Sequence, residues 1–401
     1  MTEIVKRFRV EMAAVTERWA YLNHAAVSPF PRATREAIHR FADGAAMDGT
    51  FRWPEWNAAH ESLRRLAAAE LGADAEEIAI IRSTSEGISI VAAGFPWESG
   101  DNVVLFEDEF PSNVYPWLNQ SVHGVETRRL PIPELLHYTE SVSDATDPVA
   151  MEQCGTRIAA ALHNRLDEAI DARTRIVAIS WVAFRTGFRH DLDAIVELAH
   201  RRGALLCVDA IQALGTIPIN VRETPVDFLI ADGHKWLMGP EGIGVMYIRR
   251  NLLDRIRPVC VGWASVAGTR DFDRIDLTWK PDAGRYEHGA PNMIGAAGFH
   301  ESWKLLAELG VRNIEQAVVG ITDHAVEQLR AIGAQIHSVR SASHQSGIVI
   351  FSIPDRDPEA LQRQCEEDGV VLVRRGAGLR LSPHAYNNTD DIDRLIRAVT
   401  R

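Results

Sequence analysis

Two side chains that could do chemistry together stand at the ends of neighbouring apolar runs. Asp209 follows the run at residues 204–208, and Lys235 follows the run at residues 228–230, just before a glycine-rich segment. A lysine amine forms a Schiff base with an aldehyde, and a buried acid keeps a pyridine nitrogen protonated so that the ring accepts electrons. The pair predicts a site for pyridoxal 5'-phosphate (PLP), with Lys235 and Asp209 as catalytic residues.

Polar residues beside this pair are also expected to bind the cofactor. Gln212 could reach the phenolic oxygen of the cofactor or could equally be a surface group. His234 could bond the phosphate through its backbone or have only a structural role. Asp209 itself could be the N-cap of a following helix. The occurrence of the acid and the lysine after successive strands favours the cofactor site.

A phosphate site is predicted where the early strand at residues 77–81 runs into a helix. Ser83 and Glu86 have the spacing of a capping box, which leaves N–H groups free at the helix start. A phosphate there gains backbone hydrogen bonds and the positive end of the helix dipole. We therefore expect Thr84 and Ser85 to bind the phosphate, although most capping boxes only cap their helix.

The elements that must position these residues indicate an α/β fold. Continuous apolar, β-branched runs alternate with segments of helical period, a pattern typical of a mainly parallel sheet covered by helices on both faces. Ligands bind beyond the carboxyl ends of such strands, where Asp209 and Lys235 fall. The expected strands are residues 77–81, 102–106, 175–179, 204–208 and 228–230.

The pattern changes after about residue 265, where loops precede a smaller α+β arrangement. Its expected elements are a helix at 295–309, strands at 347–353 and 370–373, and a last helix from Asp390. We predict an N-terminal segment (1–20) packing with the small domain, a large PLP-binding domain (21–265) and a small C-terminal domain (266–401). Residues 136–153 are polar and are predicted to form an irregular surface insertion.

Composition and charge exclude several classes of protein. The 401 residues are 46% hydrophobic and 24% charged, as in ordinary globular proteins. The net charge of -12 opposes binding to nucleic acid or anionic membranes. No apolar run approaches the roughly 20 residues of a membrane span, and no secretory signal is visible. Four scattered cysteines lack metal-ligand spacing. We expect a cytoplasmic enzyme without a metal site.

Motifs along nearly the whole chain resemble the class V aminotransferase family of fold-type I PLP enzymes. This group includes cysteine desulfurases, selenocysteine lyases, kynureninases and isopenicillin N epimerase. The matching segments are residues 21–26, 82–87, 208–212, 233–236, 285–292, 380–382 and 386–387. The resemblance implies the PLP-dependent transferase fold and a homodimer whose active sites lie at the interface.

The resemblance also implies roles for residues that spacing alone does not reveal. Phe110 matches a position whose ring stacks on the pyridine, although it could instead be a core residue. Arg380 matches the anchor of the substrate α-carboxylate, since a guanidinium binds a carboxylate with two parallel hydrogen bonds. Asn23 and His24, in the matching N-terminal segment, are expected to contact the substrate.

Ala290 and Asp232 depart from the family pattern. Gly289 and Ala290 match a Gly-Thr pair that reaches the phosphate of the neighbouring subunit in relatives, so only their backbone could bind it here. Asp232 replaces a serine that often binds phosphate. A carboxylate repels the phosphate dianion, so we expect Asp232 to point elsewhere in the cofactor site or to pair with a cation.

The expected substrate is an α-amino acid, and several reactions remain open. Lys235 could support transamination, epimerisation or lyase chemistry. Epimerisation needs a second acid on the opposite face, for which His24, Tyr115 and His288 are candidates. Arg374 and Arg375 could bind a second acidic group of the substrate. A non-catalytic binding protein of this fold is the alternative of another class, but it would be expected to lack Lys235 or Asp209.

Sulfur transfer through a persulfide is disfavoured by a missing residue. Desulfurases carry a nucleophilic cysteine shortly before the carboxylate-binding arginine, whereas residues 373–379 contain none. Cys365 lies earlier, in the helix-like segment 359–368, and is expected to be structural. A lyase of this type would therefore have to work without a cysteine nucleophile.

Overall fold

The computed structural model describes residues 3–132, 147–269, 271–376 and 378–401. A seven-stranded sheet has the order β2-β8-β7-β6-β5-β3-β4. Within it, β8 runs antiparallel to both neighbours and the other pairings are parallel, which confirms the mainly parallel sheet. The strands are β2 (Ile78–Ile81), β3 (Asn102–Phe106), β4 (Glu126–Leu130), β5 (Thr174–Ser180), β6 (Leu205–Asp209), β7 (Phe228–Asp232) and β8 (Gly244–Ile248).

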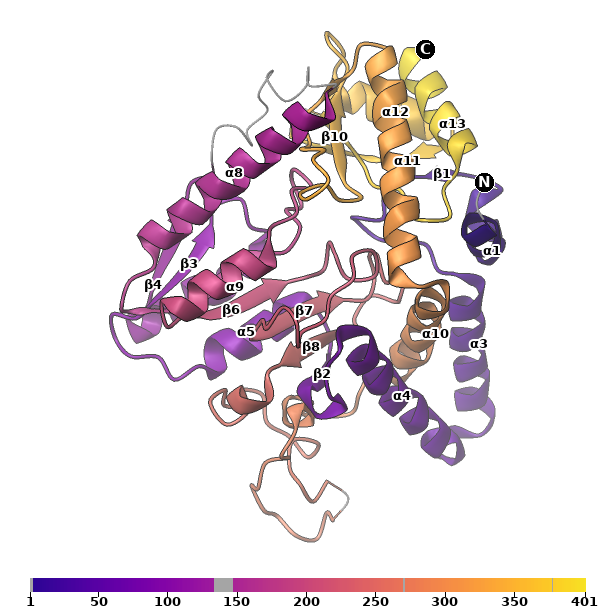
Figure 1. Cartoon of the computed structure of the whole chain (residues 1–401). Helices are drawn as coiled ribbons and strands as arrows, with labels where there is room; N and C mark the ends of the chain where they lie inside the picture. Colours follow the sequence, from indigo (N-terminus) through magenta and orange to yellow (C-terminus); the bar gives the residue numbers. More distant parts are fainter. Residues whose placement is uncertain (1–2, 133–146, 270, 377) are drawn as a thin grey trace.

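Alternate residues of the central strands face two separate apolar cores. On β6, Leu206 and Val208 belong to one core and Cys207 to the other. Helices cover both faces, because a strand buried on both sides needs apolar partners on each (Figure 1). The helices around the sheet are α3 (Arg32–Met47), α4 (Trp53–Leu71), α5 (Thr84–Gly94), α6 (Tyr115–Leu118), α8 (Pro148–Ala169), α9 (Leu192–Arg201) and α10 (Met293–Leu309).

A smaller antiparallel sheet of order β12-β13-β10-β9 forms the second part of the chain. Its strands are β9 (Gln335–Ile336), β10 (Val349–Ser352), β12 (Val373–Arg375) and β13 (Gly378–Leu381). The accompanying helices are α11 (Val311–Ala331), α12 (Pro358–Glu367) and α13 (Thr389–Thr400). This arrangement agrees with the expected α+β pattern.

The N-terminal helix contacts the smaller part of the chain. Phe8 of α1 (Glu3–Glu11) lies edge-on to the Tyr386 ring, and Arg9 forms an ion pair of 2.9 Å with Asp391. The short helix α2 (Ala13–Thr16) follows, and β1 (Ala20–Tyr21) then pairs in parallel with β11 (Val370–Val371). Helix α10 packs on α3 and α4, so the domain boundary at residue 265 stays a prediction.

The predicted irregular insertion is wrong in its last part. Residues 148–153 form the first turns of α8, whose N-cap is Asp147: its carboxylate accepts hydrogen bonds from the backbone of Val149 and Ala150. Buried Ile158 and Leu162, one helical turn apart, fix α8 on the sheet. Residues 136–146 lie outside the described part of the chain.

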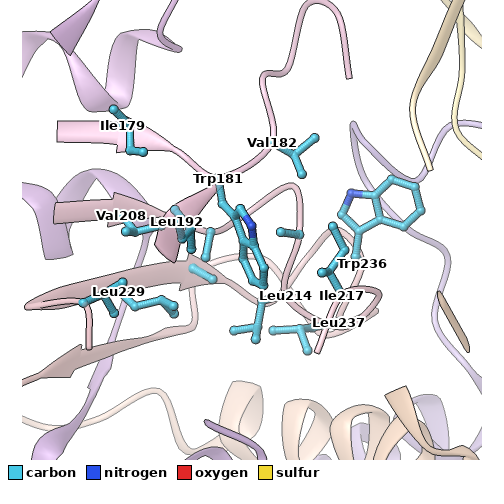
Figure 2. Packing of buried hydrophobic residues seen from close by; sticks show 14 of the residues in the cluster. Ile179, Trp181, Val182, Leu192, Val208, Leu214, Ile217, Leu229, Trp236 and Leu237 are labelled. Carbon is cyan, nitrogen blue, oxygen red and sulfur yellow. The ribbon is translucent and has the colours of Figure 1, made fainter. Parts of the chain in front are cut away.

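The loop after β7 is anchored in the larger apolar core. Figure 2 shows Trp236 and Leu237, which directly follow Lys235, extending into the same packed cluster as Leu214 and Ile217. Both side chains are almost fully buried. The core therefore fixes the backbone that carries the lysine. No helix among the described residues is both long and apolar enough to cross a membrane.

Candidate active site

A cavity of about 240 Å³ lies beyond the carboxyl ends of β6 and β7. This is where a parallel sheet binds its ligands. The cavity brings together most of the residues predicted from the sequence: Thr84, Ser85, Phe110, Asp209, Gln212, Asp232, His234, Lys235 and Arg380. No group of three or more metal-binding side chains occurs among the described residues.

Lys235 is held in a tight loop and not on a helix face. Its carbonyl accepts hydrogen bonds from Ser28 Oγ at 2.6 Å and from the Met238 backbone at 2.9 Å. Gly239 allows the loop to fold back, because a Cβ there would lie 2.5 Å from the Phe299 ring. The loop leaves the amine in the cavity, 5.5 Å from the centroid of the Phe110 ring.

Burial changes the protonation of the lysine amine. It lowers the pKa of Lys235 to about 8, although the carboxylates of Asp209 and Asp232 oppose the shift. A neutral amine is the nucleophilic form. A larger fraction of Lys235 is therefore ready to react near neutral pH than of a solvent-exposed lysine.

We predict that PLP-free protein captures PLP at a rate that rises with pH and levels off above about pH 8. The reason is that the neutral fraction of Lys235 grows up to its lowered pKa and is nearly complete beyond it. Stopped-flow absorbance at a series of pH values measures this rate. Asp232→Asn should move the midpoint to lower pH, since the Asp232 charge raises this pKa. A midpoint near the ordinary lysine value of 10.5 would contradict the prediction.

Asp209 ends β6 and is almost fully buried. Its Oδ1 accepts a hydrogen bond of 3.0 Å from the Ile211 backbone, so it caps the turn that follows the strand. That segment is a turn and not the helix that the capping alternative assumed. Burial raises the pKa of Asp209 to about 6, while the Ile211 hydrogen bond and the Lys235 charge oppose the shift. Within the described chain, Oδ2 has no hydrogen-bond partner, so it can accept one from a ligand.

The N-terminus of α5 lines the cavity through Ser83, Thr84 and Ser85. The predicted N-cap is confirmed, because Ser83 Oγ accepts a hydrogen bond from the Glu86 backbone. Thr84 Oγ1 accepts one from the Asp232 backbone at 3.1 Å and thereby ties the helix to β7. Gly87 permits this approach, since a Cβ there would lie 2.7 Å from an Ile230 methyl group. Free N–H groups at such a terminus are suited to a phosphate.

Two further cavity residues are fixed by contacts within the protein. The amide of Gln212 donates to the Ala25 carbonyl and accepts from the Trp236 indole, each at 3.0 Å. Each end of that amide can still make one more hydrogen bond. Phe110 stands edge-on to the Phe184 ring and has one face near the Lys235 amine. A ring in this place can cover a flat ligand, in line with the predicted stacking.

Asp232 lies in the cavity wall, with the His234 imidazole beside it. Its Oδ1 accepts a hydrogen bond from the Gly233 backbone and lies 3.3 Å from Nδ1 of His234. That His234 nitrogen makes no hydrogen bond of good geometry within the described residues. Whether Asp232 pairs with a cation or points away from the phosphate stays a prediction.

Arg380, on β13, lines the same cavity from the smaller sheet. The residue is 1% exposed, and its guanidinium makes only long hydrogen bonds of 3.5 Å, to the Phe184 carbonyl and to Asn23 Oδ1. Burial and the charge of Arg375 lower the pKa of Arg380 to about 9, so it stays cationic at neutral pH. A buried cation with weak partners calls for an anionic ligand.

Four predicted site residues are not among those that line this cavity: Asn23, whose Oδ1 lies 3.5 Å from the Arg380 guanidinium, His24, Gly289 and Ala290. His24 is fully buried, and its two ring nitrogens are within hydrogen-bond distance of the Ser382 carbonyl and the Tyr386 hydroxyl. Burial, with the charge of His384, keeps the pKa of His24 well below its ordinary value. Gly289 and Ala290 line a separate surface hollow. Their predicted contact with a second subunit is not represented in a single chain.

One buried carboxylate near the cavity was not anticipated. Glu109 precedes Phe110 and accepts hydrogen bonds from the backbone and hydroxyl of Ser180, at 2.7 and 2.5 Å, and from Asn113. Burial raises the pKa of Glu109 to about 8. These bonds fix the Phe110 loop to the end of β5. Its sequence position, next to the predicted stacking residue, is the one signal that could have indicated it.

The four cysteines lie outside the residues that line the cavity. Cys365 is buried in α12, where burial and nearby acids raise the pKa of its thiol to about 12. Cys154 and Cys207 are also buried, and Cys260 is exposed. No cysteine is among the residues that line the cavity around the Lys235 amine.

The donor set of the cavity fits PLP. A buried amine, a buried carboxyl with a free oxygen, an aromatic face and a helix N-terminus match the aldehyde, ring nitrogen, ring and phosphate of this cofactor. The residues that would hold it are Lys235, Asp209, Phe110, Thr84 and Ser85. The same cavity contains Arg380, which can bind a carboxylate of a substrate.

Comparisons with known proteins agree with the fold and the site. The model of the family described as Aminotransferase class-V matches residues 20–157 and 157–395. The chain belongs to the aminotransferase class-V family. It is therefore a PLP-dependent enzyme.

The relatives carry different names. A probable cysteine desulfurase of Halalkalibacterium halodurans is 29% identical, with 95% of this chain and 92% of the relative covered. An uncharacterized aminotransferase, YcbU of Bacillus subtilis, is also 29% identical, with 89% and 87% covered. Among solved structures, C-DES with glycine covalently linked to its PLP cofactor has a TM-score of 0.85 at 20% identity, with 98% of each chain covered. The cysteine desulfurase CsdA of Escherichia coli has a TM-score of 0.83 at 24% identity, covering 99% and 98%.

Proposed function

We propose that this enzyme is an aminotransferase that acts on an α-amino acid. The observation that carries the proposal is the single cavity shared by the Lys235 amine, the Asp209 carboxyl and the Arg380 guanidinium. Bound PLP supplies a ring that withdraws electrons from the substrate Cα. The chain must then bind the carboxylate, keep the ring nitrogen protonated and move one proton.

Each of these tasks has a residue in the cavity. Arg380 binds and orients the α-carboxylate, which sets the direction of the Cα–H bond. Lys235 Nζ takes the proton from Cα and can return it, because its lowered pKa makes both forms accessible near pH 8. Asp209 holds a proton at the ring nitrogen through its free oxygen. Transamination needs no further group.

Two of the other reactions need groups that are not among the residues lining the cavity. Persulfide formation needs a thiolate, and no cysteine is among the residues that line the cavity. Epimerisation needs a second proton carrier on the opposite face. The candidates do not reach the cavity in the described chain: His24 is enclosed, Tyr115 is 67% exposed, and His288 lines the separate hollow.

A β-lyase without a cysteine nucleophile is the second candidate. The names of the relatives favour it, since several are cysteine desulfurases that cleave a carbon–sulfur bond. Lys235 could take the Cα proton in such a reaction as well. The difference is the fate of the side chain, which leaves in a lyase and stays in a transaminase.

A panel of amino acids, each incubated with and without an α-keto acid acceptor, tests the proposal. Keto-acid product that requires the acceptor, with the side chain intact, supports transamination. Release of the side-chain group with ammonia, independent of the acceptor, supports the lyase instead. Chiral chromatography of the recovered amino acid detects epimerisation, which would overturn the assignment of Lys235 as the sole proton carrier.

We predict that Arg380→Lys lowers kcat/KM for the amino acid by about ten-fold to a hundred-fold. Lysine keeps the charge but loses the two parallel hydrogen bonds, worth roughly 1.5–3 kcal/mol. Steady-state kinetics measures the loss, and the absorbance of bound PLP should not change. Arg374→Lys, on the opposite side of the same hairpin, is the control. An unchanged kcat/KM in Arg380→Lys would remove Arg380 from the substrate site.

A homodimer with active sites at the interface is part of the proposal. Apolar side chains that are 46–95% exposed in the single chain support it. They are Val259, Val261, Trp263, Phe272, Ile275 and Leu277. Light scattering gives the mass, and a monomer with full PLP occupancy would contradict the shared site.

A cytoplasmic location also stays a prediction, supported by four unpaired cysteines.

A further inference from the structure

Arg375 is a second guanidinium that lines the same cavity as Arg380. The hairpin of β12 and β13 explains why both face it. Val373 lies directly opposite Arg380, and Arg375 is two residues further along β12. Directly opposed residues, and residues two apart on a strand, share one face of a sheet. The register therefore puts both arginines on the cavity side and Arg374 on the other.

No protein carboxylate neutralises this pair within the described part of the chain. Arg375 has one long hydrogen bond, of 3.4 Å, to the Arg374 carbonyl, and its buried Nε has no partner. The Nε of Arg380 is likewise unpartnered. A third guanidinium, that of Arg185, lies over the Phe184 ring. The backbone carbonyl of Phe184 accepts the long hydrogen bond from Arg380. Burial, together with the Arg185 charge, lowers the pKa of Arg375, and no acid opposes this shift.

The two acids that line the cavity, Asp209 and Asp232, form no ion pair with Arg375 or Arg380 among the described residues. Asp232 is beside His234, and the charges of Asp209 and Asp232 act on Lys235. Buried cations are normally paired, because burial of an uncompensated charge is costly. One α-carboxylate can satisfy Arg380. Arg375 is half-buried, and its unpartnered Nε favours a second anion beside it.

We infer that Arg375, supported by Arg185, forms a subsite for an anionic group on the substrate side chain, so that the enzyme takes acidic α-amino acids or the corresponding dicarboxylic keto acids. This inference rests on the proposed function, because it takes Arg380 as the α-carboxylate anchor. It adds the chemical class of the side chain. Arg375 selects the substrate, while Lys235 and Asp209 carry out the chemistry.

Binding of unreactive acids tests the subsite without any turnover. Glutarate carries two carboxylates, and butyrate carries one. Isothermal titration of the PLP-loaded enzyme should give a Kd for glutarate on the order of ten-fold to a hundred-fold below that for butyrate. Malonate, succinate and adipate then give the side-chain length that fits best. Equal affinity for all the dicarboxylates and butyrate would overturn the inference.

Variants of adjacent arginines supply the matched control. Arg375→Gln should abolish the preference for the dicarboxylate and leave butyrate binding unchanged. Arg374→Gln should keep the preference, because Arg374 is exposed and its guanidinium points to Glu359, 3.6 Å away. Arg375→Lys should retain part of the preference and provides a variant that keeps the charge if Arg375→Gln does not fold. Equal effects of Arg374→Gln and Arg375→Gln would overturn the subsite.

Two further measurements separate this inference from the proposed function. If Arg375→Gln instead weakens the affinity of the PLP-free protein for PLP, Arg375 serves the cofactor phosphate and the subsite is wrong. Rates are compared for glutamate and aspartate against glutamine and asparagine. Turnover that favours the neutral amides overturns the subsite and leaves the aminotransferase intact. Arg375-dependent glutarate binding without any amino-acid turnover supports the subsite and overturns the aminotransferase.

Discussion

Lys235→Ala is expected to abolish turnover, with kcat falling by at least about a thousand-fold, or roughly 4 kcal/mol of barrier. The Lys235 amine is the one lysine amine in the cavity and the proposed proton carrier. The variant should still fold, because the loop is fixed by its backbone and by Trp236 and Leu237 in the core. Rapid-mixing kinetics with the best amino acid measures the loss.

Because the chain has few lysines, chemical labelling can identify the one that forms the Schiff base with PLP. The chain contains only Lys6, Lys235, Lys280 and Lys304. Borohydride reduction followed by peptide mapping should place the pyridoxyl label on Lys235. Lys304→Ala, which removes an exposed lysine of α10, is the control and should retain full activity. A label on any of the other three lysines would refute the assignment.

Asp209→Asn is expected to bind PLP and to lower kcat by on the order of a hundred-fold to a thousand-fold, or roughly 3–4 kcal/mol. An amide cannot stabilise a protonated ring nitrogen as a carboxylate does, so the ring withdraws electrons less well. The Asn side chain can still accept the Ile211 hydrogen bond that caps the turn. The loss should therefore appear in the chemical step and not in the melting temperature.

A pH profile separates the two roles of Asp209. The carboxyl must be ionised to hold the ring proton, so the rate of the native enzyme should fall as the pH drops through about 6, the raised pKa of Asp209. This fall should be absent in Asp209→Asn. Near-normal turnover by Asp209→Asn would mean that the residue only caps the turn.

Residues governed by local pattern were predictable from the sequence. Central strands such as β3 and β6 are buried on both faces, so their apolar runs mark them directly. The acid and the lysine follow such strands, which is why their proximity could be foreseen. Strand β8 was not predicted, although its residues are apolar and buried, because it lies directly after a glycine-rich turn.

Residues governed by distant contacts were not predictable in the same way. His24 has the side chain of an acid–base catalyst, but the Ser382 carbonyl and the Tyr386 hydroxyl, more than 350 positions away, occupy its ring nitrogens. The sequence could not separate Arg374 from Arg375 as partners of a second acid. The register of the hairpin decides between them, because it fixes which of two adjacent side chains faces the cavity.

The pairing of β1 with β11 has a consequence for how the enzyme matures. It joins Ala20 to Val370, and the adjacent bridge joins Asn23 to Ser382, close to Arg380. Contacts between such distant residues form slowly, because a long loop must close before they stabilise anything. On a ribosome, the α5 terminus and the Lys235 loop can fold before β11 and β13 have been synthesised. Newly made chains would thus acquire the cofactor pocket first and the carboxylate anchor last.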